Sequence, residues 1–141
     1  MPGSLFRTGR KGGTATEEVI EMPEIIFREE LPYRGNSYEL EGYLHGKAGA
    51  SVIFFEGPPG SRPLLHRHPY AEVFIVQEGQ ATFIVGDASL EVTGGQIVVA
   101  PAGVPHKFTN TGTGSLRQID IHASDRFVTV WQRRQNVLVQ P

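Results

Sequence analysis

The stretch from Gly60 to Gly79, GSRPLLHRHPYAEVFIVQEG, constrains this chain most, because it brings three side chains able to bind a metal close together. His66 and His68 are two residues apart, so an extended strand would present both imidazoles on one face. Glu72 follows just beyond a turn that contains Pro69. The pattern therefore predicts short strands whose side chains converge on one point.

A second stretch, Gly95 to Asn110 (GQIVVAPAGVPHKFTN), presents His106 on another strand after a Pro/Gly turn. Three histidines and one glutamate supply nitrogen and oxygen donors suited to a divalent transition metal. The alternative, three unrelated imidazoles at the rim of a barrel, is disfavoured because burying them without partners is costly. Glu72 shares its strand parity with Phe74 and Val76, which indicates that it faces inward.

Both stretches resemble the signature motifs of the cupin superfamily. The first reads Gly, five residues, His-x-His, three residues, Glu, six residues, Gly over residues 60–79. The second reads Gly, five residues, Pro-x-Gly, two residues, His, three residues, Asn over residues 95–110. The resemblance implies an all-β fold, a cupin-type antiparallel β-barrel built as a double-sheet jelly roll. It also implies that the chain binds one divalent ion of Fe, Mn, Ni, Cu or Zn. The implied ligands of this ion are His66, His68, Glu72 and His106.

Length, charge and cysteine content exclude several classes of protein. The chain has 141 residues, which suits one domain with a single core. A formal net charge of −2 gives no field that favours nucleic acid or an anionic membrane, so we expect a small-molecule partner. There are no cysteines, which excludes disulfides and thiolate ligands. No apolar run reaches membrane-spanning length or forms a secretory signal, so a cytoplasmic location is expected.

We expect a flexible N-terminal arm over residues 1–18 and a single barrel domain over residues 19–141. The arm is rich in Gly, Thr and charged residues and offers little to a core. Residues 19–31 include an Ile-Ile-Phe run that favours an edge strand. Beyond it, short β-branched runs alternate with Gly and Pro turns at the close spacing typical of antiparallel sheets.

Two of these expected strands, residues 73–76 and 97–100, have apolar residues at both odd and even positions. Each would therefore present hydrophobic side chains to the outside as well as to the interior. That outer face must be covered, either by the chain's own N-terminal strand or by another molecule. Similarity to cupins implies a second copy of the chain, so we expect a homodimer.

Further side chains are expected around the metal. Phe74 and Phe108 share strand faces with ligands and are predicted to wall the cavity, with Tyr70 nearby. Residues 116–122, LRQIDIH, allow two interpretations. In the preferred one, Ile119 and Ile121 face the core and Arg117 points into the cavity. In the other, another strand covers the outer face, and Gln118 and His122 line a polar pocket. Arg62 in the preceding loop is expected to be solvated rather than to bind a carboxylate.

The expected function is that of a metal-dependent oxidoreductase, dioxygenase-like, acting on a small chelating organic substrate. Four protein ligands leave two octahedral positions for substrate and dioxygen. A non-oxidative isomerase, lyase or decarboxylase is the alternative, and it would need an acid or base such as Glu56 or Tyr70. A cupin that binds a small ligand without chemistry is the third hypothesis. No residue beyond the ligands is identified as catalytic from the sequence.

Overall fold

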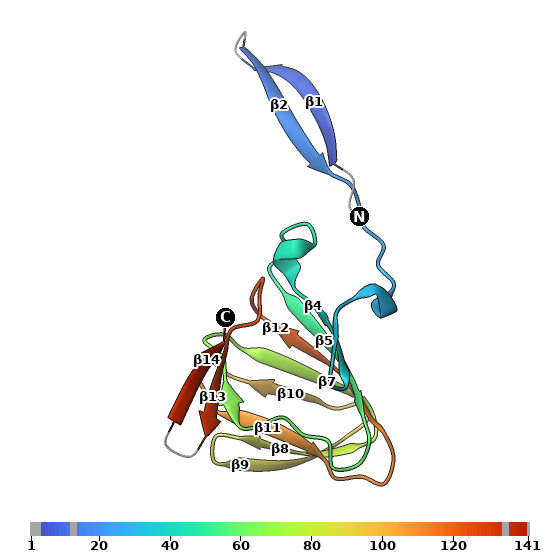
Figure 1. The fold of residues 1–141 in the computed structure, drawn as a ribbon, viewed down its shortest axis with the longest axis vertical. Coiled ribbons are helices and arrows are strands. Elements are labelled where there is room, and N and C mark those ends of the chain that lie inside the picture. The colour runs from blue at the N-terminus through green and yellow to red at the C-terminus, as the bar shows by residue number, and fades with distance from the viewer. Residues whose placement is uncertain (1–3, 12–13, 134–135, 141) are drawn as a thin grey trace.

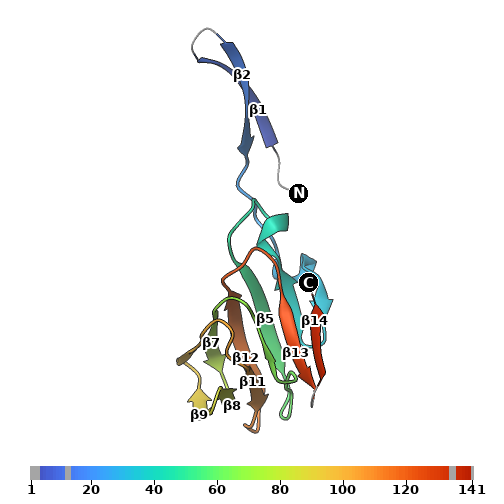
Figure 2. The ribbon, with the colours of Figure 1, turned by 90° about the vertical axis from the view of Figure 1, so that its left-hand side faces the viewer.

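A computed structural model of the chain describes residues 4–11, 14–133 and 136–140. Two six-stranded antiparallel sheets form a barrel of the double-sheet jelly-roll type, which confirms the all-β fold (Figures 1 and 2). In spatial order the first sheet contains β10 (Ile97–Ala100), β7 (Glu72–Glu78), β12 (Leu116–His122), β5 (Ser51–Gly57), β4 (Ser37–Leu40) and β3 (Tyr33–Arg34). The second contains β14 (Asn136–Gln140), β13 (Thr129–Arg133), β6 (His66–Arg67), β11 (His106–Asn110), β8 (Gln80–Val85) and β9 (Ala88–Thr93).

The described helices are two single 3-10 turns, η1 (Arg28–Glu30) and η2 (Gly42–Leu44). None of the helices within the described ranges has the length and hydrophobicity needed to cross a bilayer. The many Gly and Pro residues agree with the shortness of these helices, because both residues interrupt long helices.

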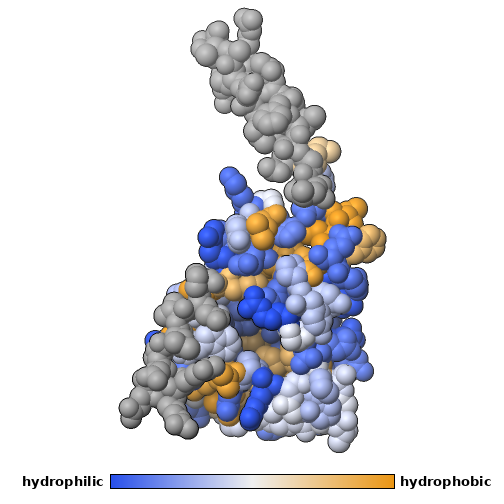
Figure 3. Space-filling model, viewed as in Figure 1, coloured by the Kyte–Doolittle hydropathy of each residue, from blue (hydrophilic) through white to orange (hydrophobic). Residues whose placement is uncertain are grey.

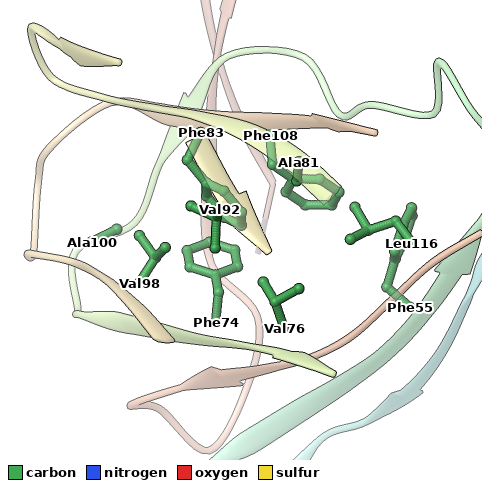
Figure 4. Close-up of a cluster of buried hydrophobic side chains, with 10 residues drawn as sticks. All are labelled: Phe55, Phe74, Val76, Ala81, Phe83, Val92, Val98, Ala100, Phe108 and Leu116. Atoms are coloured by element: carbon green, nitrogen blue, oxygen red, sulfur yellow. The ribbon is translucent and has the colours of Figure 1, made fainter. Parts of the chain in front are cut away.

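Alternating burial along the central strands creates the barrel interior. In β12 every second side chain is buried, from Leu116 to His122, and β11 shows the same period. Phe74 and Phe83 pack edge to face, with ring centroids 5.1 Å apart, and Phe108 contacts both rings (Figure 4). These aromatic rings connect the two sheets, because Phe74 lies on β7 and the other two on β8 and β11, and the Phe74 ring also contacts His106.

Gly79 turns the chain between β7 and β8. Its φ of +97° lies in the region that only glycine adopts readily. A Cβ at this position would also collide with the backbone carbonyl of Ser115. The last glycine of the first motif is therefore needed for a turn and a close approach of two backbones.

The N-terminal segment is a separate hairpin, β1 (Ser4–Lys11) with β2 (Thr14–Glu21), which pairs with neither large sheet. Figure 1 shows it extending away from the barrel. Residues 1–3 and 12–13 lie outside the described residues. The predicted mobility of the 1–18 arm stays a prediction.

The edge strand expected over residues 19–31 is wrong for most of its length. β2 ends at Glu21, and residues 22–27 form neither strand nor helix. Ile25 is 91% exposed and Phe27 is 68% exposed, and Figure 3 shows hydrophobic surface where this segment leaves the barrel. The Ile-Ile-Phe run has high β-propensity, but propensity reflects packing on a sheet, and none of the described strands pairs with this run.

The outer face of the first sheet is apolar across five strands, as the sequence predicts for β7 and β10. Register places Ile97, Ile75, Ile119, Phe54 and Tyr38 in one row. A second row contains Val99, Val73, Ile121, Val52 and Leu40. We call these ten residues the outer apolar face. At its edge, Ile97 is 61% exposed and Val99 57% exposed.

The aromatic core provides a stability prediction. Phe83→Ala should lower the free energy of unfolding by about 3–5 kcal/mol, because a fully buried ring would leave a cavity between the sheets. Leu90→Ala is the matched control: Leu90 pairs with Phe83 in register but is 39% exposed. Denaturant unfolding measures both. Equal losses for the two variants would contradict a core centred on Phe83.

Candidate metal centre

Four predicted ligands meet at one end of the barrel. His66 begins β6, His68 follows it, Glu72 begins β7 and His106 begins β11, where it pairs in register with His66. One ligand atom from each residue lies within 4.8 Å of the others. All four side chains are buried. The structure therefore brings together the set that the sequence predicts as metal ligands.

Backbone carbonyls orient the three motif histidines. The Nδ1 atoms of His66, His68 and His106 lie 2.7, 2.9 and 3.0 Å from the carbonyl oxygens of Leu64, Val128 and Val104. A carbonyl oxygen can only accept a hydrogen bond, so each Nδ1 must carry the proton and donate it. Each neutral ring is then left with a lone pair on Nε2, the form in which histidine binds a metal.

Glu72 lies at the centre of these imidazoles. Its Oε1 is 3.0 Å from His68 Nε2 and 3.1 Å from His106 Nε2. His68 Nε2 is buried and has no partner in hydrogen-bond geometry. Nitrogen lone pairs directed at a carboxylate repel it unless a cation lies between them. The unpartnered His68 Nε2 and the Glu72 oxygen close to two imidazoles are therefore suited to bind a divalent transition metal between them.

Burial and the mutual contacts change the acidity of the site. Burial lowers the pKa of His66 to about 4, which keeps this imidazole neutral near pH 7. Burial alone would raise the pKa of Glu72, but the close approach of the His106, His122 and His68 imidazoles outweighs it and lowers the pKa well below its usual value. The site therefore holds one carboxylate and a neutral His66 without requiring extra protons.

β12 has the opposite orientation to the preferred sequence interpretation, which is wrong. Gln118 and His122 are buried, with 1% and 3% of their surface exposed, and Asp120 between them is also buried. Arg117 points outward and contacts Glu78 at 3.4 Å. The reason is that the outer apolar face holds Ile119 and Ile121, so the polar side chains of β12 turn inward.

Asp120 is a site residue that the sequence did not single out. It lines the cavity, and Gln118 Nε2 donates to its Oδ1 at 2.9 Å. Burial and the nearby Glu72 charge raise the pKa of Asp120 well above its usual value. Its parity with His122 is the signal that could have identified it.

A cavity of about 390 Å³ opens beside the ligands. Its walls include both predicted phenylalanines, Phe74 and Phe108, together with Phe127 and Trp131, which sequence reasoning did not place there. Arg62 also lines it. Tyr70 and Gln118 are not wall residues: Tyr70 lies behind His122, its hydroxyl 2.8 Å from the His122 Nδ1, and Gln118 lies behind Asp120.

A family model described as a cupin domain matches residues 53–122, which include both motifs. Oxalate oxidase in complex with the substrate analogue glycolate superposes with a TM-score of 0.60 at 22% identity, covering 68% of this chain and 55% of that one. This chain belongs to the cupin superfamily. A variant of oxalate decarboxylase from Bacillus subtilis has a TM-score of 0.66 at 18% identity and covers 74% of this cupin, but 30% of that chain.

An uncharacterised Klebsiella pneumoniae protein with a double-stranded β-helix domain matches 79% of this cupin and 99% of its own chain, at 20% identity and a TM-score of 0.61. Among curated sequences, the uncharacterised protein MJ1618 of Methanocaldococcus jannaschii is 33% identical over 61 residues, 43% of this cupin. Auxin-binding protein 5 of Zea mays is 40% identical over 50 residues, 36% of this cupin. The matches span about half and a third of these two relatives, 49% and 33%.

The ligand set predicts the effect of removing one imidazole. His106→Ala should weaken binding of Mn(II) or Zn(II) by more than about 100-fold, because it removes a donor rather than a supporting contact. His45→Ala is the control, since His45 pairs with Glu24 at 2.7 Å and lies outside the ligand set. Elemental analysis and competition with a chromophoric chelator measure both. Equal metal affinity in wild type and His106→Ala would remove His106 from the set.

Proposed function

We propose that this cupin is a metal-dependent oxidoreductase, dioxygenase-like, that acts on a small chelating organic substrate. The observation that carries the proposal is a four-donor group with a cavity on its open side. Four donors leave two positions of an octahedron for exogenous ligands. A divalent metal bound there would supply Lewis acidity and, if redox-active, electron exchange with dioxygen.

The charge of the site favours an anionic substrate. One carboxylate with neutral imidazoles leaves a divalent cation with net positive charge, which attracts a carboxylate or enolate. Phe74, Phe108, Phe127 and Trp131 give the cavity an aromatic wall. These rings would pack against the carbon atoms of a small acid bound beside the metal.

Relatives support small organic acids as substrates. Glycolate occupies the similar oxalate oxidase structure as a substrate analogue, and the Bacillus subtilis oxalate decarboxylase has Mn(II) centres. We therefore favour Mn(II) among the candidate ions and a short hydroxy- or dicarboxylate as the substrate class.

The decarboxylase relatives also favour a non-oxidative lyase as the second candidate. Of the two acid–base groups that the sequence suggests for it, Tyr70 does not line the cavity, and burial raises its pKa to about 12. Glu56 lines a separate hollow with Arg117. Neither group supports the lyase, which leaves Asp120, the cavity carboxyl with the raised pKa, as its acid. The oxidative candidate is preferred because the two open positions suit dioxygen beside a chelating substrate.

Dioxygen separates these candidates. Protein loaded with Mn(II) or Fe(II) and given oxalate or glycolate should consume the acid only in the presence of oxygen, because the proposed chemistry needs an electron acceptor. Oxygen uptake and product analysis in parallel aerobic and anaerobic reactions measure this. Undiminished anaerobic turnover would favour the lyase, and saturable binding without turnover under any metal would favour a binding protein.

We also propose that two copies pair through the outer apolar face. Its ten residues form a hydrophobic centre, and Arg117 beside Glu56 at one end provides both signs of charge for a polar rim. An apolar centre with a polar rim is the usual arrangement of an interface. In a dimer with a two-fold axis, the apolar face of one copy would pack against the apolar face of the other, and the charges of the two rims could pair. A second copy of the chain is therefore the partner that fits this face.

Sedimentation velocity tests this pairing. Wild type should sediment as a dimer at micromolar concentration, and Val99→Lys should shift it to monomer, because a lysine covered by the second copy would lose its water without a partner. Leu90→Lys is the control, since Leu90 is an exposed apolar residue on β9 of the other sheet. A monomeric wild type, or dissociation by both variants alike, would rule out this interface.

A further inference from the structure

His122 presents a fourth imidazole to the site that the ligand set does not use. Its side chain is 3% exposed and lines the cavity. Its Nε2 lies 3.1 Å from Glu72 Oε2, but outside hydrogen-bond geometry, and has no other partner. A buried nitrogen without a partner is costly, so this atom is placed to receive a ligand.

We propose that His122 binds the substrate next to the metal, its Nε2 hydrogen-bonding a hydroxyl oxygen of a small hydroxy-carboxylate. This inference rests on the proposed metal site. It adds a residue that recognises the hydroxyl group of the substrate. The carboxylate of such a substrate would occupy the open side of the ligand set, and its hydroxyl would face β12.

The partner of Nδ1 distinguishes His122 from the three ligands. Carbonyl oxygens behind His66, His68 and His106 restrict each ring to one tautomer. Behind His122 stands the Tyr70 hydroxyl, 2.8 Å from Nδ1, which can donate or accept. His122 Nε2 can therefore either accept a hydrogen bond from a hydroxyl or donate one to an oxygen, and keep its contact with Tyr70 in both cases.

Neighbouring groups hold this ring in one orientation. The Val128 N–H donates to the Tyr70 hydroxyl oxygen at 3.2 Å. The Phe127 and His68 rings meet the His122 ring edge to face, with centroids 4.8 and 4.7 Å away. Tyr70 in turn stacks on His68 at 5.0 Å with an interplanar angle of 10°. A side chain held this firmly loses little entropy when a ligand binds.

Position separates His122 from a metal ligand. The group of atoms that lie within 4.8 Å of one another contains His66, His68, Glu72 and His106 but not His122. His68 and His106 approach Glu72 Oε1, whereas His122 approaches Oε2 on the other side of the carboxylate. His122 thus flanks the metal position, where a substrate bound through two oxygens would extend.

Glycolate and acetate binding to Mn(II)-loaded protein tests the inference. Both probes carry a carboxylate, but only glycolate adds a hydroxyl. His122→Leu should weaken glycolate binding about tenfold, the usual effect of losing one buried hydrogen bond, and change acetate binding less than about twofold. His122→Gln, which keeps a polar group at similar reach, should recover part of the glycolate affinity. Calorimetry measures the affinities.

The affinity for Mn(II) is the second measurement. His45→Gln is the control variant, because His45 lies outside the ligand set and pairs with Glu24. His122→Leu should retain Mn(II) within about threefold of wild type, whereas His106→Ala should not. Equal weakening of Mn(II) by both variants would make His122 a ligand and overturn the inference. Unchanged glycolate affinity in metal-loaded His122→Leu and His122→Gln would also overturn it, while the metal site would stand. Failure of wild type to bind any divalent metal would instead refute the proposed function.

Discussion

The site depends on one constraint, the hydrogen bonds that tie three histidine Nδ1 atoms to backbone carbonyls. They orient Nε2 of each ring toward Glu72 and remove the alternative tautomer. The carbonyls belong to residues 64, 104 and 128, which lie in loops just before β6, β11 and β13, three neighbouring strands of the second sheet. Glu72 lies on β7 of the first sheet, so the two sheets must pack together before all four donors meet, and binding of a metal there would be linked to folding of the domain.

The same closure explains why the interior changes character along its length. Phe74, Phe83 and Phe108 join the sheets in a hydrophobic layer below the ligands. On β12, Leu116 faces that layer, while Asp120 and His122 on the same strand face lie in the polar region beside Glu72. A polar row is tolerated inside this barrel because its groups contact one another and face a cavity rather than packed hydrocarbon.

Sequence reasoning was most accurate where motif spacing carries the information. The meeting of four candidate ligands, the two phenylalanines of the cavity and the run of short strands all follow from local pattern. It failed at residues 22–27, where high β-propensity found no neighbouring strand. It also failed at β12, because period-two alternation shows that a strand has two faces but does not tell which one points inward when both can be buried.

The sequence by itself determined the cupin motifs, the chemistry of the ligand set and the all-β class, because these depend on residue type and short spacing. Only the tertiary structure decided the rest. Trp131 and Phe127 reach the cavity from a segment far along the chain, and Tyr70 meets His122 across 52 positions of sequence. Such contacts arise from how the two sheets pair and close, and the register between distant strands is not written in any local pattern.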